Sequence, residues 1–123
     1  MKISASVRLA GLVLFLFAGA VGAQTQASPP ALFIVNFETG PSWDKSRPPA
    51  EQPSFREHSA NLNRLRKEGA IVFGARHAEI GMIFLKAESL EAAKAVIDAD
   101  PGVRAGIFIY SVAPLNVFYP WQP

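Results

Sequence analysis

The sequence contains no cysteine among its 123 residues. This absence excludes a disulfide, a thiol nucleophile, a lipid-modified cysteine and any cysteine-ligated zinc or iron–sulfur site. The fold must therefore be stabilised by packing alone, and half of the residues are hydrophobic. Such a composition suits one small domain with a single core.

The chain also has little net charge, with 12 Lys and Arg against 10 Asp and Glu. Lys2 and Arg8 lie in an N-terminal segment that we expect to be removed, which leaves the mature chain neutral. A nucleic-acid-binding domain is expected to carry a basic excess. The dense basic stretch "RLRK" at 64–67 should lie on the solvated side of a helix, so no nucleic-acid partner is predicted.

A hydrophobic run is present near the N-terminus, but it is short for a helix that spans a membrane. The uncharged segment 9–21 has 13 residues, which as a helix would cover only about 20 Å of a bilayer core of about 30 Å. Basic residues precede it and small residues, "VGA" at 21–23, follow it, as in a secretory signal peptide. We predict cleavage after Ala23 and a periplasmic or secreted product without a membrane anchor; a retained anchor is the weaker interpretation.

Motifs for metals, cofactors and activated nucleophiles are lacking. His77 and Glu79 could ligate a metal ion, but a site needs at least a third ligand. Ser42 and Asp44 have no hydrolase motif around them, and there is no phosphate-binding loop. We therefore predict neither a metal nor a cofactor.

What the sequence does contain is a regular succession of elements after a flexible lead at 24–30. β-Branched and aromatic residues mark the strands, and apolar residues at helical spacing mark the helices. The expected strands are 31–38, 70–76, 79–86 and 105–112, and the expected helices are 53–69 and 89–100. The proline-rich loop 39–53 is long for so small a domain, and such loops are often functional or disordered.

The order β-α-β-β-α-β is that of ferredoxin-like folds. The predicted fold class is therefore α+β, with a four-stranded antiparallel sheet and both helices on one face, over a domain at 31–123. The strands are apolar on both sides, since Ile107 and Ile109 alternate with Phe108 and Tyr110. Two helices cover only one face of the sheet, so we predict a homodimer that packs through the other.

Capping signals mark the helix ends. Ser54 and Glu57 predict a capping box, and Gly69 stands where a C-terminal glycine belongs. Ser89 is the expected N-cap of the second helix, and Pro101 should end that helix at residue 100.

His58 and Asp100 are the candidate functional pair. His58 falls on the buried stripe of the first helix, three residues after Phe55 and four before Leu62. Asp100 lies at the end of the second helix, and the topology brings it to His58 only if residues 100–104 fold back. Without further evidence, a single histidine on such a stripe is usually a structural residue, and an aspartate before proline usually caps a helix or turn.

The pattern of these residues resembles the YCII-related family over residues 31–118. The similarity is carried by Phe55, His58, Leu62, Leu65, Gly69, "VFGA", Gly81, "SLEAA" and "DADPGVRAGIF". It implies a dimeric ferredoxin-like α/β barrel with His58 and Asp100 as an active-site dyad. Departures from the family pattern are "GA" at 74–75 in place of Gly-Pro, Gly102 in place of a common aromatic residue, and the long loop 39–53. Because these changes would reshape the cleft, the substrate of a relative is not transferred.

Two functions are compatible with these features. A carboxylate bound to one imidazole nitrogen fixes the tautomer and leaves the other nitrogen as a base. A small exported enzyme could then carry out proton abstraction, elimination or isomerisation on a small organic molecule, with Arg76 orienting an anionic substrate and Trp43 covering it. The alternative is a non-catalytic dimeric module that binds a small ligand or a partner protein, with Arg76 and Trp43 as ordinary surface or packing residues.

Overall fold

The computed structural model describes residues 19, 22 and 29–122. Apart from residues 19 and 22, the predicted signal peptide lies outside the described residues, as do residues 24–28 of the predicted lead. No helix within the described part of the chain is long and apolar enough to cross a membrane.

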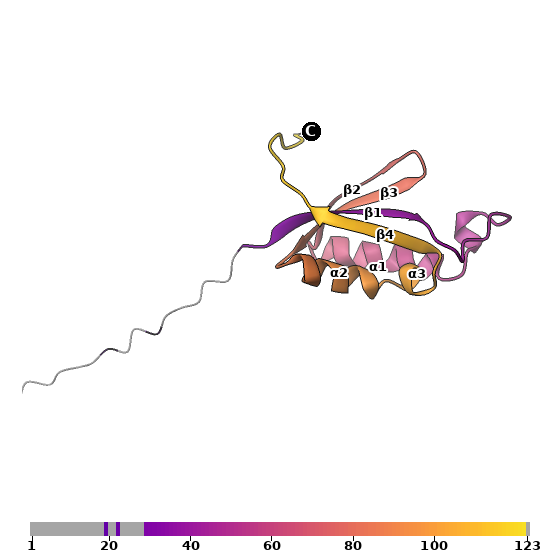
Figure 1. The fold of residues 1–123 in the computed structure, drawn as a ribbon, viewed down its shortest axis with the longest axis horizontal. Coiled ribbons are helices and arrows are strands. Elements are labelled where there is room, and N and C mark those ends of the chain that lie inside the picture. The colour runs from indigo at the N-terminus through magenta and orange to yellow at the C-terminus, as the bar shows by residue number, and fades with distance from the viewer. Residues whose placement is uncertain (1–18, 20–21, 23–28, 123) are drawn as a thin grey trace, which may run out of the picture.

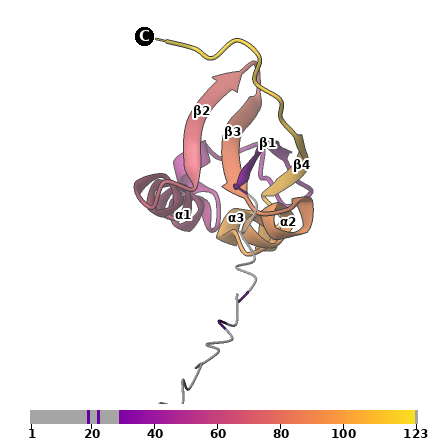
Figure 2. The same cartoon turned by 90° about the vertical axis from the view of Figure 1, so that its left-hand side faces the viewer.

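The described chain forms one antiparallel sheet with helices on one face (Figures 1 and 2). The elements are β1 (Ala31–Thr39), a short 3₁₀ turn η1 (Pro49–Glu51), α1 (Phe55–Lys67), β2 (Ile71–His77), β3 (Ile80–Ala87), α2 (Leu90–Asp98), α3 (Pro101–Arg104) and β4 (Phe108–Pro114). The strand order is β2-β3-β1-β4, and every neighbouring pair is antiparallel. This arrangement confirms the predicted ferredoxin-like α+β fold.

The core lies between the sheet and the helices. Alternate residues of β1, namely Phe33, Val35 and Phe37, are buried on the helix-covered face. Leu65 of α1 and Ile97 of α2 pack onto them. The apolar stripes predicted from helical and strand spacing therefore meet in one core.

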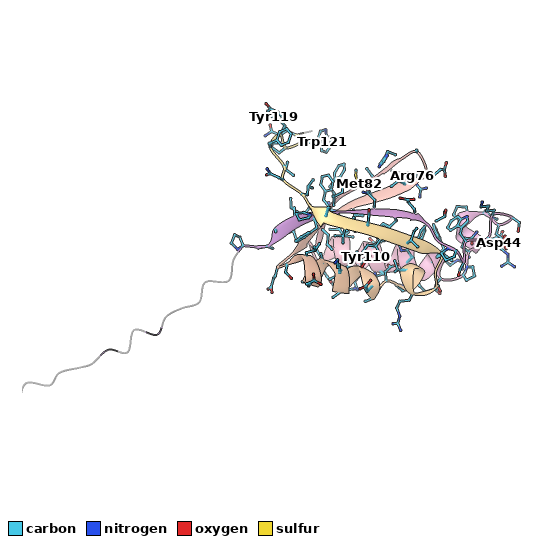
Figure 3. The ribbon with its side chains drawn as sticks, in the orientation of Figure 1. Asp44, Arg76, Met82, Tyr110, Tyr119 and Trp121 are labelled. Atoms are coloured by element: carbon cyan, nitrogen blue, oxygen red, sulfur yellow. The ribbon has the colours of Figure 1, made fainter. Side chains whose placement is uncertain are left out.

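The opposite face of the sheet is also apolar and has no helix over it (Figure 1). Ile34 on β1 lies beside Phe84 on β3, and Ile109 on β4 is 51% exposed. Near the centre of this outer face, the side-chain oxygen of Asn36 is buried and has no hydrogen-bond partner among the described residues. The C-terminal segment after β4 rises on this side and carries Tyr119 and Trp121 (Figure 3), which are 87% and 77% exposed.

One predicted capping interaction is absent, and one is confirmed. Ser54 precedes α1 in a left-handed conformation with φ of 62°, and its side chain makes no capping hydrogen bond, so the predicted capping box does not form. A capping side chain reaches the helix amides from an extended backbone. Ser89 has that backbone, with φ of −155°, and its hydroxyl accepts a hydrogen bond from the Ala92 amide.

The helix expected at 89–100 ends at Asp98, and a short helix that was not predicted follows it. α2 stops at Asp98, and α3 begins at Pro101, with Asp100 as its N-cap in an extended conformation. The residue before a proline is pushed out of helical geometry, and proline itself is well suited to the first position of a helix. Asp100 therefore starts a new helix rather than ending the old one. The last strand consequently begins at Phe108, three residues later than predicted.

Candidate active site

His58 and Asp100 meet in the interior of the domain. The imidazole Nδ1 lies 2.7 Å from Asp100 Oδ1, with the His58 residue 7% exposed and Asp100 fully buried. His58 is in the first turn of α1, and Asp100 caps α3, which packs against α1. The fold-back at 100–104 that the contact requires is thus supplied by the short helix α3.

The carboxylate of Asp100 is saturated with donors. Besides the contact with His58, its Oδ1 accepts hydrogen bonds from the amides of Gly102 at 2.9 Å and Val103 at 3.2 Å, and its Oδ2 accepts one from Asn61 Nδ2 at 2.8 Å. Burial raises the pKa of Asp100, but the hydrogen bonds from His58 and Asn61 outweigh that effect and the pKa is lowered below its usual value. Asp100 is therefore an anion at neutral pH.

An ionised carboxylate only accepts hydrogen bonds, so the proton between the two side chains belongs to His58 Nδ1. The neutral imidazole then carries its lone pair on Nε2, at the far side of the ring. Phe37 and Phe108 flank the ring, with centroid distances of 5.4 Å and 4.5 Å, and restrict its rotation. The surroundings hold the ring in one plane and one tautomer.

Asn61 is a member of the site that the sequence analysis missed. Its amide donates to Asp100, and its Oδ1 accepts a hydrogen bond of 2.8 Å from Arg64 Nη2. Arg64 Nη1 in turn binds both carboxylate oxygens of Glu68. Because Arg64 can only donate, it fixes which end of the Asn61 amide faces Asp100. The signal was available in the sequence, since Asn61 lies three residues after His58 and so on the same side of α1.

Glycine is required beneath the His58–Asp100 pair. A Cβ atom on Gly102 would lie 2.9 Å from the Phe108 ring, 3.0 Å from His58 Cβ and 3.2 Å from Asp100 Oδ1. The Phe108 ring occupies the space that a larger side chain at residue 102 would need. Close packing around residue 102 therefore accounts for a glycine at this position.

A cavity of about 360 Å³ opens beside His58, between α1, the β2–β3 hairpin and the loop that follows β1. Its volume falls in the range of about 300–1,000 Å³ that is typical of small-molecule sites. Trp43 and Arg76, the two predicted binding residues, both line it. Arg76 projects from the hairpin (Figure 3). Their role in binding stays a prediction.

The long loop between β1 and α1 is ordered by one buried glutamine. Gln52, 4% exposed, donates to the carbonyls of Asp44 at 2.6 Å and Arg47 at 3.0 Å, and accepts from the Asp44 amide at 2.9 Å. These bonds place Trp43 against Phe55 and Phe108, with ring centroids 6.4 Å and 5.6 Å apart. The loop is thus a fixed wall of the cavity.

In the described residues no group of three His, Asp or Glu side chains is placed to hold a metal ion. His77 and Glu79 lie at the tip of the β2–β3 hairpin, where both are exposed. Glu79 lines the cavity together with Arg76.

The sequence pattern of the YCII-related domain matches residues 39–116, which include His58, Asp100, Arg76 and Trp43. The chain belongs to the YCII-related family. Among curated proteins, no member of the family or other relative matches this chain. A similar solved structure is that of 5-chloro-2-hydroxyhydroquinone dehydrochlorinase from Burkholderia phenoliruptrix AC1100, in complex with 2,5-dihydroxybenzoquinone. It is 20% identical, has a TM-score of 0.47, and the match covers 69% of this YCII-related chain and 93% of that chain.

The lowered pKa of Asp100 predicts a specific acid sensitivity. Since the carboxylate is stabilised in the folded state, Asp100 contributes to the free energy of unfolding at neutral pH, and this contribution is lost as the pH falls below the usual value of 3.8. We expect Asp100→Asn to lower the free energy of unfolding by about 2 kcal/mol at pH 7. The variant should also lose less of its stability than the wild type as the pH falls below about 5. Urea unfolding from pH 7 to pH 3 measures both effects.

The control for this measurement is Glu88→Gln, which changes an exposed carboxyl group away from the site. Glu88→Gln should follow the wild-type profile. An unchanged acid slope in Asp100→Asn would show that the buried carboxylate is not stabilised by its neighbours.

Proposed function

We propose that this YCII-related protein is an acid–base catalyst that acts on a small organic molecule in the cavity beside His58. The observation that carries the proposal is the buried Nδ1–Oδ1 hydrogen bond, which assigns the proton to Nδ1 and leaves Nε2 as the basic atom of a residue that lines the cavity. His58 and Asp100 are the proposed catalytic histidine and its positioning carboxylate.

In the proposed reaction, Nε2 accepts a proton from a C–H or O–H group of the substrate. Asp100 stabilises the imidazolium that forms, because the positively charged ring donates its Nδ1–H to a buried anion. The same Nε2–H then returns the proton to another atom, which gives isomerisation, or to a leaving group, which completes an elimination. General acid–base catalysis of this kind contributes typically about 10²–10⁴-fold in rate.

Solvent deuterium exchange tests the proposal without knowledge of the substrate. A panel of small carbonyl acids and phenols in D₂O is followed by NMR, with and without the protein. At least one compound should exchange a carbon-bound proton faster with the wild type, and His58→Asn should lose this acceleration by about 10²-fold or more. His77→Asn, which changes the exposed hairpin histidine, should retain it.

The alternative function is a non-catalytic binding module. For such a module, a compound would bind in the cavity of both the wild type and His58→Asn. Neither protein would accelerate deuterium exchange of any compound. That result would contradict catalysis while leaving the ligand site in place.

We further propose that two copies of the chain associate through the outer face of the sheet. Apolar side chains on this face and the unpartnered oxygen of Asn36 support the proposal, since an unsatisfied buried polar atom costs about 1–3 kcal/mol. Exposed apolar surface of this kind commonly marks an interface.

Substitution of the central outer-face residue Ile34 tests the dimer. Ile34→Lys places a charge on the proposed interface and should yield a monomer in analytical ultracentrifugation, whereas Ala95→Lys, on the exposed side of α2, should leave the dimer intact. Circular dichroism checks that both variants fold. A wild-type monomer at micromolar concentration would contradict the proposal.

We also propose that the chain is exported with removal of residues 1–23, which is supported by the charged, apolar and small-residue segments of its N-terminus. Expression of the full sequence in a Gram-negative host should give a periplasmic or secreted product whose mass corresponds to an N-terminus at Gln24. A cytoplasmic product of full mass would contradict export.

A further inference from the structure

The walls of the cavity beside His58 identify a class of ligand more closely than the acid–base pair does. We propose that the cavity takes a flat aromatic anion, with the ring against the aromatic wall and the carboxylate or phenolate on the Arg76 guanidinium. The inference rests on the proposed function, because it places the ring of the ligand next to Nε2 of the proposed base.

One wall of the cavity consists of aromatic side chains from three separate segments. Trp43 comes from the loop after β1, Phe55 from the start of α1 and Phe108 from the start of β4. Their ring centroids lie 5.6–6.4 Å apart. These distances belong to the range in which aromatic rings attract each other edge to face or offset, so another ring fits the same pattern.

Two glycines leave space on the hairpin side of the cavity. Gly74 on β2 and Gly81 on β3 both line the cavity and lie on the helix-facing side of the sheet, opposite Ile83 and Phe37 respectively. A Cβ atom at Gly74 would come no nearer than 3.7 Å to any neighbour, and one at Gly81 no nearer than 3.9 Å. Neither glycine has a left-handed backbone.

The fold therefore does not require glycine at either position, in contrast to Gly102. What the two glycines provide is space next to the strand backbone. A planar ring fits between strand backbone and aromatic side chains better than a puckered aliphatic ring of the same size.

The charge of the ligand follows from Arg76. Its side chain leaves β2 on the same face as Gly74, two residues further on, and it makes no hydrogen bond or ion pair with any residue of 29–122. A guanidinium group matches the planar geometry of a carboxylate and binds it through two parallel hydrogen bonds. Glu79, the other charged residue of the cavity, lies at the hairpin turn and would instead attract a cation.

Four small probes separate these features: benzoate, benzamide, benzylamine and cyclohexanecarboxylate. Their dissociation constants are measured by ¹H–¹⁵N NMR titration of the full mature protein, followed at the amides of Gly74 and Gly81 and at the His58 ring nitrogens. Benzoate should bind about tenfold more tightly than benzamide or cyclohexanecarboxylate, which corresponds to about 1.4 kcal/mol. Benzylamine should bind most weakly.

Two variants test the assigned contacts. Arg76→Gln should weaken benzoate to the level of benzamide, whereas Arg104→Gln, which removes an exposed arginine of α3 outside the cavity, should leave benzoate binding unchanged. Gly74→Val should abolish binding of every ring probe while the His58 ring signals stay those of the wild type. Tighter binding of benzylamine, equal binding of cyclohexanecarboxylate, unchanged binding of benzoate to Arg76→Gln or no binding of any probe would each overturn the inference.

The outcome is separable from that of the proposed catalysis. Preferential binding of benzoate without deuterium exchange on any aromatic acid would support the ligand class and contradict catalysis. Exchange that depends on His58 but occurs only on the aliphatic acids of the panel, with no preference for benzoate in the binding measurements, would support catalysis and overturn the ligand class.

Discussion

The hydrogen bond between His58 and Asp100 joins two parts of the structure, α1 and the start of α3, that are distant in sequence. Asp100 is at once the N-cap of α3, the acceptor for Asn61 on α1 and the partner of His58 Nδ1. A carboxylate without these donors would be costly to bury, and their presence lowers its pKa instead. The position of α3, the tautomer of His58 and the direction of its free nitrogen all depend on this one anion.

The cavity is shaped by constraints of opposite kinds. Around His58 the packing is close: the Phe108 ring centroid lies 4.5 Å from that of His58, and a Cβ atom at residue 102 would collide with Phe108. On the hairpin side the packing is open, because Gly74 and Gly81 leave space that the fold would allow a side chain to fill. Gln52 fixes the loop that carries Trp43, which forms another wall of the cavity. The closely packed part holds His58, and the open part leaves the space in which we propose that a ligand binds.

Much of this was predictable from sequence because it depends on local pattern. Strand alternation and helix stripes predicted the sheet and its core, and the resemblance to the YCII-related family pointed to His58 and Asp100. Of the two failures, one has a local cause and one depends on a contact distant in sequence. A serine followed by glutamate predicted a capping box, but Ser54 adopts a left-handed conformation in which its side chain makes no capping bond. Asn61 was missed because its partner, Asp100, is 39 residues away and the contact exists only once α3 has folded back.

The most direct test is ¹⁵N NMR of the imidazole nitrogens at neutral pH, in the wild type and in Asp100→Asn, with the exposed His77 as reference. We predict that His58 is a single tautomer with the proton on Nδ1 and an unprotonated Nε2, whereas Asp100→Asn shows a mixture or the reverse tautomer and His77 is unchanged. Two results would contradict the central claim that this carboxylate prepares His58 as a base: a wild-type His58 with its proton on Nε2, or a His58 tautomer that is the same in the wild type and in Asp100→Asn.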